Sequence, residues 1–383
     1  MTRETMNPDE RIDAAIRLEE VDRTPLIVGT SGPFVARYRG MTVADAYRYP
    51  DKIAQAELDL FDALGGWDAR YGVVGLHDFN RLYPMNPTHW AIRRLMPGVE
   101  LPENVDVQND EQEVMGEDEY DRLFEIGWPE FWLSLVNRIQ NGVTWERVNE
   151  AAASMGAQRH KNSLLWAHRG VNELCVTGAM DPPTMLANWR SAAPFMLDIR
   201  RQYDKVRKAV KEVILPVFLG VFRQSIRKSG HHRALIPAAR YVMPFVSPQV
   251  FEDLLWSWMK GAAAIALEEG AYPVFHLDSD WTEALHYFKE LPKGKCLLHF
   301  GGETDIFKAK EILGGHCCLM GDVPPATISV ASSREVEAYC RKLMDVLGEG
   351  NGFIMCEGCF LPATAKFENV KAMVDVAKNY RLR

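Results

Sequence analysis

Six side chains that can bind a metal or transfer protons lie at the ends of short apolar runs between residues 272 and 370. They are Asp278, Asp280, His299, Asp322, Cys356 and Cys359. A polar loop follows each run, and in most cases a helix-like segment follows the loop. Such repeated units predict parallel strands, because parallel pairing requires a crossover connection. Functional residues of parallel sheets and barrels collect just past the carboxyl ends of the strands, so this stretch is the expected site.

His299 is the strongest single candidate in this stretch. It comes near the end of the run CLLHFGG, so its side chain is expected where the strand meets the loop. The two glycines that follow allow a ligand or another backbone segment to approach closely. A neutral imidazole is a common zinc ligand, and His299 is therefore expected to bind metal.

The run YPVFHLDSDW places His276 and Asp278 on one face of a strand, because side chains alternate along a strand. Near the mouth of a barrel, these two residues could bind a metal or transfer protons. His276 could equally be a hydrogen-bonded core residue, and Asp280 could be the N-cap of a helix that begins at Thr282. His276 and Asp280 are the candidates for acid–base catalysis.

Cys356 and Cys359 form a C-x-x-C pair after the strand-like run GFIM. A thioredoxin-like redox motif would need a helix start here, but proline and alanine intervene. A four-cysteine zinc site with Cys317 and Cys318 would use two adjacent ligands, a spacing that rarely suits zinc. A single thiolate from this loop beside His299 agrees better with a catalytic zinc, which keeps three protein ligands and one open position.

The composition excludes several other classes of protein. The 383 residues include 47% hydrophobic and 25% charged residues, which is ordinary for a globular protein. A formal net charge of −8 disfavours general nucleic-acid binding, which depends on neutralising phosphates. Seven cysteines, an odd number, argue against a secreted disulfide framework. With no signal peptide and no run of about 18 uncharged apolar residues, we expect a cytoplasmic protein that binds no membrane.

Other catalytic motifs are missing from the sequence. It contains no nucleophile elbow, P-loop or HExxH pattern. Catalysis through Ser-His-Asp therefore has no local support, and no carboxylate spacing singles out a glycosidase pair.

Helices and strands alternate along the predicted chain. Strands are predicted at 24–28, 70–76 and 233–241, ahead of the four units of 272–370. Residues 29–40 are expected to form a glycine-containing loop. Helices are predicted at 7–18, 42–49, 51–64, 128–139, 144–155, 194–215 and 247–270. Pro216 is expected to end the helix at 194–215, because proline cannot donate the next helical hydrogen bond.

The size of the repeated units predicts the fold class. Each unit spans roughly 25 to 35 residues, which suits a (β/α)8 barrel of ~250 residues. We therefore predict an α/β fold, a TIM-type (β/α)8 barrel with N-terminal helices and with insertions in the middle third, at about 80–190. The whole chain, 1–383, is expected to form one domain. A doubly wound open sheet is the alternative, but its glycine-rich dinucleotide fingerprint is missing.

At these residues the chain resembles the uroporphyrinogen decarboxylase superfamily, most clearly from about Ser247 to the C-terminus. The resemblance implies a TIM-type barrel with its site at the carboxyl-end mouth. True decarboxylases of the superfamily carry an arginine-rich motif just after the first strand. The corresponding residues here read VGTSGPFVARYRG and lack it, so porphyrinogen decarboxylation is not expected.

The chain is more similar to the zinc- and cobalamin-dependent methyltransferases of that superfamily. Motifs of ether-demethylating members read here as DSDWT (278–282), LPKGK (291–295), TDIFKAKEILG (304–314) and GDVP (321–324). Thiol-methylating members carry a His-x-Cys pair and a later Gly-Cys. The former reads His299-Phe300-Gly301 here, and the latter is Gly358-Cys359.

This resemblance implies roles for individual residues. Asp278, His299 and Cys359 become the expected zinc ligands. Trp281 and Asp322 become candidates for contacts with a cofactor or an aryl ring. His276, Cys356 or His316 could replace one of the ligands.

The predicted function follows from the resemblance. We expect a zinc-dependent methyltransferase, a component of an O-demethylase, that moves a methyl group between a small methoxylated molecule and the cobalt of a corrinoid carried by a partner protein. Methyl ethers are poor electrophiles, so a Lewis acid on the ether oxygen would stabilise the leaving group. A homodimer is compatible with this reading. The alternatives are a metal-free decarboxylase or lyase on the same barrel, and a non-catalytic binding subunit.

Overall fold

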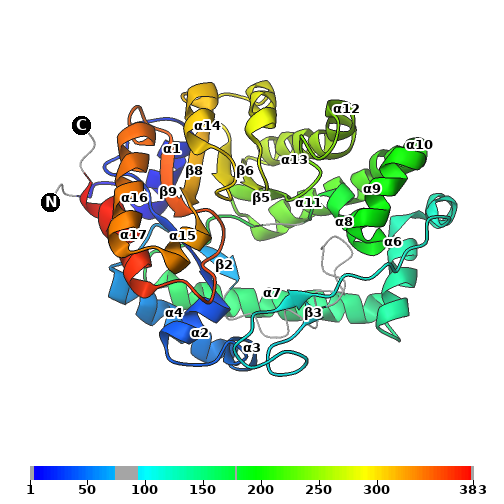
Figure 1. Ribbon diagram of the computed structural model, residues 1–383, viewed down its shortest axis with the longest axis horizontal. Coiled ribbons are helices and arrows are strands. Elements are labelled where there is room, and N and C mark those ends of the chain that lie inside the picture. Colours follow the sequence, from blue (N-terminus) through cyan, green and yellow to red (C-terminus); the bar gives the residue numbers. More distant parts are fainter. Residues whose placement is uncertain (1–3, 74–93, 177–178, 381–383) are drawn as a thin grey trace.

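A set of parallel strands organises this computed structural model, which describes residues 4–73, 94–176 and 179–380 (Figure 1). One sheet contains five strands in chain order: β5 (Arg233–Ala238), β6 (Tyr272–Leu277), β7 (Leu297–Phe300), β8 (Cys318–Val323) and β9 (Phe353–Glu357). β1 (Ile27–Ser31) and β2 (Ala69–Val73) pair in parallel as a second sheet. The four units predicted at 272–370 therefore contain β6 to β9.

Backbone bridges join the two sheets into a ring. The parallel bridge between Leu26 and Met355 joins the start of β1 to β9. On the other side, residues 173–176 lie between the sheets, with parallel bridges to Arg70 of β2 and to Ala234 of β5. This segment supplies the eighth position of the ring, so the predicted TIM-type barrel is confirmed.

Alternation along the strands fills the barrel interior. The inward side chains form one buried cluster with Ile12, Ala15 and Ile16 of helix α1 (Pro8–Ile16), which closes the amino-terminal end of the barrel. The strand members of the cluster are Ile27, Ala69, Tyr71, Leu174, Val274, Leu297, Cys318, Met320, Ile354 and Cys356. With one end closed by α1, the carboxyl-end mouth is left for function.

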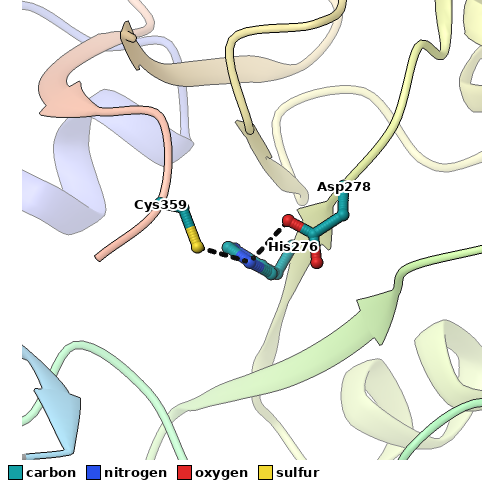
Figure 2. A group of neighbouring side chains, drawn as sticks. All are labelled: His276, Asp278 and Cys359. Carbon is teal, nitrogen blue, oxygen red and sulfur yellow. Dashed lines mark hydrogen bonds and ion pairs between the residues drawn. The ribbon is translucent and has the colours of Figure 1, made fainter. Parts of the chain in front are cut away.

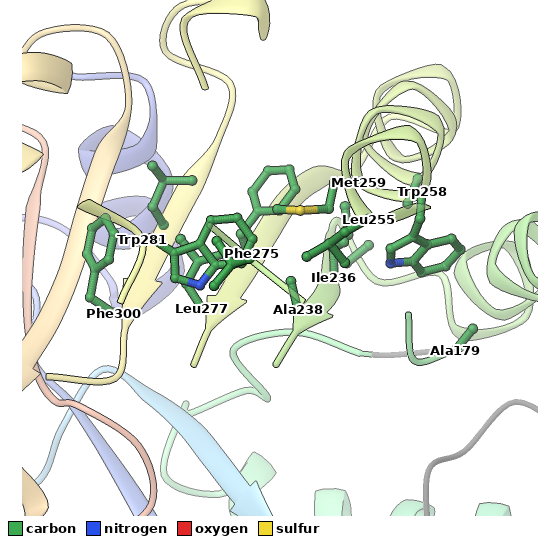
Figure 3. Close-up of a cluster of buried hydrophobic side chains, with 14 of the residues drawn as sticks. Ala179, Ile236, Ala238, Leu255, Trp258, Met259, Phe275, Leu277, Trp281 and Phe300 are labelled. Atoms are coloured by element: carbon green, nitrogen blue, oxygen red, sulfur yellow. The ribbon is translucent and has the colours of Figure 1, made fainter. Parts of the chain in front are cut away.

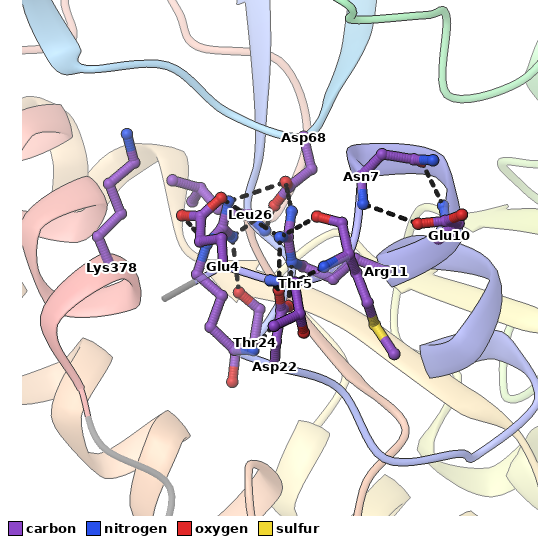
Figure 4. A network of polar contacts seen from close by, with 12 residues as sticks. Glu4, Thr5, Asn7, Glu10, Arg11, Asp22, Thr24, Leu26, Asp68 and Lys378 are labelled. Carbon is purple, nitrogen blue, oxygen red and sulfur yellow. Dashed lines mark hydrogen bonds and ion pairs between the residues drawn. The ribbon is translucent and has the colours of Figure 1, made fainter. Parts of the chain in front are cut away.

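Ion pairs hold α1 in place (Figure 4). The guanidinium of Arg11 lies 2.6 Å from Asp22 and 2.6 Å from Asp68, and both Arg11 and Asp68 are buried. Asp68 also pairs with Arg23 at 2.7 Å and accepts a hydrogen bond from the backbone N–H of Leu26 at 2.8 Å. The network therefore ties α1 to the starts of β1 and β2.

Helices cover the outside of the strands. They are α4 (Pro50–Leu64), α8 (Pro182–Arg190), α11 (Leu215–Ser229), α13 (Ser257–Glu268), α14 (Ile306–Leu313), α15 (Pro325–Val330), α16 (Ser333–Leu347) and α17 (Phe367–Asn379), with the 3-10 helix η4 (Thr282–Glu290). Figure 3 shows Ile236 and Phe275 of the strands facing Leu255, Trp258 and Met259. α13 continues from α12 (Pro248–Val250) and the π-helical η3 (Phe251–Trp256), so the predicted helix at 247–270 is confirmed.

The middle third contributes long helices and a hairpin. α6 (Tyr120–Ile139) and α7 (Trp145–Ala167) extend beyond the helices predicted at 128–139 and 144–155. β3 (Arg94–Leu95) and β4 (Gln108–Asn109) pair antiparallel. Residues 74–76 of the predicted strand at 70–76, and 80–93 of the predicted insertions, lie outside the described residues. The single-domain reading of 1–383 stays a prediction. Among the described residues, no helix is long and apolar enough to cross a membrane.

The predicted loop at 29–40 is wrong. β1 continues to Ser31, and residues 32–38 form helix α2 (Gly32–Tyr38). The hydroxyl of Ser31 accepts a hydrogen bond from the backbone N–H of Phe34 at 3.2 Å, and Pro33 lies in the first turn. This N-cap and proline favour the start of a helix, so residues 32–38 are helical although the segment contains glycine. The short helix α3 (Asp45–Arg48) follows before α4.

The predicted end of a helix at Pro216 is also wrong. The chain breaks earlier, at Gln202 between α9 (Ala192–Arg201) and α10 (Tyr203–Lys208). A π-helical stretch, η2 (Ala209–Ile214), then leads directly into α11, which has Pro216 in its first turn. Proline fits there because the wider π-helical turn already interrupts the regular hydrogen-bond ladder.

Candidate functional site

Three side chains with different donor atoms meet at the carboxyl-end mouth of the barrel (Figure 2). His276 is on β6, Asp278 follows directly after this strand, and Cys359 lies in the loop after β9. Nε2 of His276 lies 3.2 Å from Oδ1 of Asp278 and 3.8 Å from Sγ of Cys359. One donor atom of each residue lies within 4.8 Å of the others. We call these residues the mouth triad.

Backbone packing positions Cys359. The N–H of Gly358 donates to the carbonyl oxygen of Val323 at 3.0 Å, and Leu361 N–H donates to Gly29 at 2.8 Å. A Cβ at position 358 would overlap the carbonyl oxygen of Gly301. Only glycine therefore allows the loop after β9 to approach the loop after β7 this closely.

His299 lies beside the mouth triad but outside it. It is in register with His276 on the neighbouring strand, and the Nδ1 atoms of the two rings lie 2.9 Å apart. Nε2 of His299 lies 2.8 Å from the carbonyl oxygen of Glu357. Both ring nitrogens of His299 are thus engaged away from Asp278 and Cys359. The structure therefore groups His276, and not His299, with Asp278 and Cys359. The role of His299 as a metal ligand stays a prediction.

The hydrogen bonds of His299 determine which nitrogen of His276 is free. The carbonyl of Glu357 can only accept, so Nε2 of His299 carries a proton, and Nδ1 of neutral His299 is an acceptor. Nδ1 of His276 then donates to it. When His276 is neutral, this tautomer leaves its Nε2 lone pair directed at Asp278 and Cys359, as a metal ligand requires.

The phenol of Tyr71 completes this support. Its hydroxyl lies 2.9 Å from Nδ1 of His276 and 3.3 Å from Nδ1 of His299. Tyr71 is 4% exposed, and burial raises the pKa of its hydroxyl well above the ordinary value, so it stays protonated. Sequence reasoning missed Tyr71. The alternation ARYGV places it on the inward face with Ala69, but nothing local marks it as part of the site.

The two histidines differ in proton affinity. Burial lowers the pKa of His276, but the hydrogen bonds and charges of Asp278 and Cys359 outweigh it and raise the pKa to about 10. Burial and the neighbouring charge of His276 lower the pKa of His299 to about 3. Without a metal, the triad therefore holds a proton on His276 beside ionised Asp278.

The donor set of the mouth triad fits zinc. Tetrahedral zinc with nitrogen, oxygen and sulfur ligands places neighbouring donor atoms about 3.3 to 3.7 Å apart. The separations of 3.2 and 3.8 Å lie close to this range. The side chain of Asp278 is 42% exposed and that of His276 is 11% exposed, so the triad opens to solvent on the side of Asp278. Three ligands with one open side agree with a catalytic site.

Two of the other predicted residues have structural roles. Asp280 is exposed, and its carboxylate accepts a hydrogen bond from Thr282 N–H at 2.9 Å. The N-cap residue of η4 is Trp281, so the N-cap predicted at Asp280 is wrong by one residue. Trp281 is 0% exposed, and its ring packs against Phe288. Its Nε1–H donates to the carbonyl of Asp278 at 2.7 Å. The predicted ligand contact of Trp281 disagrees with this burial, and the indole instead fixes the backbone of the triad.

Three other predicted candidates lie apart from the triad, namely Asp322, Cys356 and His316. The carboxylate of Asp322 accepts from the hydroxyl of Tyr339 at 2.7 Å and is 3% exposed, so the predicted cofactor contact does not fit. Cys356 belongs to the buried cluster inside the barrel. His316 precedes β8, and its Nε2 pairs with the carbonyl of Leu291 at 2.9 Å. Neither Cys356 nor His316 belongs to the mouth triad.

The fold and the site define a (β/α)8-barrel protein with a group of mixed donors at the carboxyl-end mouth. Residues 241–380 match the sequence model of the family described as Uroporphyrinogen decarboxylase (URO-D), which confirms the resemblance over the part of the chain that contains β6 to β9. The structure is similar to that of a methyltransferase from Methanosarcina mazei, with a TM-score of 0.67 and 18% identity, over 98% of this chain and 99% of that chain. At this identity the similarity shows a shared fold. No curated protein matches the sequence.

Proposed function

We propose that the protein is a zinc-dependent methyltransferase that moves a methyl group between a small methoxylated molecule and the cobalt of a corrinoid on a partner protein. The mouth triad of His276, Asp278 and Cys359 is the observation that carries this proposal. The family match over residues 241–380 and the fold shared with the Methanosarcina mazei methyltransferase support it.

The chemistry explains why such a triad is useful. Removing a methyl group from an ether breaks the methyl–oxygen bond and leaves negative charge on the oxygen. Zinc held by the triad would act as a Lewis acid on that oxygen. The chain itself contributes rigid placement, because His299 and Tyr71 orient His276 and the indole of Trp281 holds the backbone of Asp278. Such pre-organisation lowers the cost of stabilising the developing charge.

The pairing of His276 with Asp278 favours a second candidate function, that of a metal-free lyase. In the metal-free triad the pKa of His276 is raised to about 10, so His276 is a cation paired with Asp278 at 3.2 Å. A lyase could use this imidazolium to protonate the carbon that loses carbon dioxide. A metal-free decarboxylase is therefore the second candidate function, and the experiment below distinguishes it from the methyltransferase.

The test compares the two reactions on one protein. The zinc-loaded enzyme is incubated with reduced cobalamin and a panel of methoxylated aromatic compounds, and methylation of cobalamin is followed by its absorption spectrum. We expect methylation with the wild type and a loss of at least about 100-fold with His276→Ala, since a ligand is removed. The exposed variant Glu337→Gln is the matched control and should behave like the wild type.

Two results would overturn the proposal. One is the absence of cobalamin methylation across the panel together with release of carbon dioxide from carboxylated analogues by metal-free enzyme. The other is equal methylation by the wild type and by His276→Ala, which would remove the triad from the reaction.

A further inference from the structure

A small volume beside the mouth triad is bordered by two carboxylates. A Cβ placed on Gly301 would lie 2.6 Å from Oε2 of Glu303 and 3.6 Å from Oδ1 of Asp278. The same point lies 3.4 Å from the carbonyl oxygen of Leu277. The missing side chain of Gly301 therefore leaves room for the Glu303 carboxylate on the side of Asp278, outside the group of donor atoms that lie within 4.8 Å of one another.

The backbone around Glu303 is firmly held, although its side chain is exposed. Thr304 is 2% exposed, accepts a hydrogen bond from Trp281 N–H at 2.9 Å and donates to the carbonyl of Ser279 at 3.2 Å. These bonds fix the loop after β7 against the segment that follows Asp278. Glu303 itself is exposed. Its carboxylate thus extends from a firmly held loop at the open side of the triad.

We propose that Glu303 is a fourth ligand of the cation held by His276, Asp278 and Cys359. The inference rests on the proposed function, because it assumes that the triad binds a divalent cation. Two carboxylates beside one small volume repel each other in the absence of a cation, and a divalent ion relieves that repulsion. Glu303 then occupies the fourth position until a substrate oxygen takes it.

Two substitutions remove this contact in different ways. Glu303→Gln keeps the shape of the side chain and removes its charge. Gly301→Ala keeps the Glu303 side chain and places a methyl group 2.6 Å from the present position of its Oε2. The clash is with the end of a flexible, exposed side chain, so Glu303 can turn away and the fold should be kept. Glu311→Gln, at a carboxylate that is 68% exposed on α14, is the control.

Binding of Co²⁺, used as a spectroscopic stand-in for zinc, provides the measurement. We expect about 10-fold weaker Co²⁺ binding in Glu303→Gln and in Gly301→Ala, in the range found when groups around a metal site are removed. Both variants should show the same change in the visible spectrum of bound Co²⁺. The double variant should bind no more weakly than the weaker single variant, because both substitutions remove one contact. Glu311→Gln should match the wild type.

The possible outcomes separate the inference from the proposed function. Wild-type affinity and spectrum in both single variants, with Co²⁺ bound by the wild type, would overturn the role of Glu303 and leave the triad standing. Additive losses in the double variant would also overturn it. Failure of the wild-type protein to bind Co²⁺ or Zn²⁺ would overturn both proposals. Thermal unfolding of the metal-free variants detects a folding defect independently.

Discussion

The Nδ1 atoms of His276 and His299 lie 2.9 Å apart on neighbouring strands, and this contact assigns the two histidines different roles. His299 has its second nitrogen on the carbonyl of Glu357, so it can accept a proton only at Nδ1. His276 must then present Nε2 to Asp278 and Cys359. In the proposed function, His276 would bind the metal and His299 would orient it.

His276→Ala and His299→Ala should therefore weaken metal binding to different extents. His276→Ala removes a ligand and should abolish tight zinc binding. His299→Ala removes only the orienting partner and should weaken zinc binding by about 10- to 100-fold. Competition titration with a chelating dye measures both affinities. Equal loss in the two variants would contradict the separation of roles.

Gly358→Ala should damage both stability and the site. The added Cβ would overlap the carbonyl oxygen of Gly301, and backbone cannot move aside as a side chain can. We expect a loss of about 1 to 3 kcal/mol in the free energy of unfolding and weaker zinc binding, since the loop that carries Cys359 is displaced. Chemical denaturation measures the first effect.

Gly156→Ala is the matched control for this substitution. Gly156 lies within α7, and a Cβ there would meet nothing within 4 Å. Alanine should raise stability by about 0.5 to 1 kcal/mol, because glycine is unfavourable in a helix interior. A stability loss at Gly156 equal to that at Gly358 would show that the contact with Gly301 is not the cause.

Asp322 should make stability depend on pH. Burial raises its pKa from 3.8 to about 6 in the folded protein. Between these values the folded state binds more protons than the unfolded state, so this contribution to stability is present at low pH and is lost as the pH rises through 6. Its size is about 2 to 3 kcal/mol, since each pKa unit corresponds to about 1.4 kcal/mol.

Asp322→Asn isolates this effect. The amide oxygen can still accept the hydrogen bond from Tyr339, and it carries no charge at any pH. The stability of the variant relative to the wild type should rise between pH 4 and pH 7, measured by urea denaturation at about 0.5-unit intervals. A constant difference across this range would mean that Asp322 titrates normally.

Loss of Asp68 should lower the stability of the protein, because Asp68 belongs to the ion-pair network that ties α1 to the starts of β1 and β2. Arg11 and Asp68 both have side chains that are 1% exposed, and Asp68 also binds Arg23 and the backbone of Leu26. Asp68→Asn would leave the buried guanidinium of Arg11 with less compensation, and we expect a loss of about 3 kcal/mol. Glu337→Gln breaks an exposed pair with Arg341 and should cost less than about 0.5 kcal/mol. Similar losses in the two variants would contradict the importance of burial.

The barrel fold could be predicted from the sequence where apolar runs alternate with helix-like segments. The strands from β6 to β9 were predictable, and side-chain alternation alone placed His276 and Asp278 on one face. Residues 173–176 were missed as a barrel segment, because they are short and pair only through isolated bridges. A segment of this kind takes its strand geometry from its neighbours in the ring rather than from its own residues.

The choice between His276 and His299 could not be made from local pattern. It depends on strand register and on Tyr71, which is 205 residues away from His276 in the chain. Likewise, the burial of Trp281 depends on its packing against Phe251 and Phe288, which come from separate segments. Chemistry at a barrel mouth is assembled from several strands, so motifs identify the candidates and tertiary packing selects among them.

Metal content of the purified protein tests the central claim most directly. Plasma mass spectrometry should find about one zinc per chain in the wild type, as a single three-ligand site predicts. His276→Ala and Cys359→Ser should lose it. His316→Ala should retain it, because His316 is bonded to Leu291 outside the triad. Zinc retained in His276→Ala but lost in His299→Ala would contradict the triad and restore His299 as the ligand.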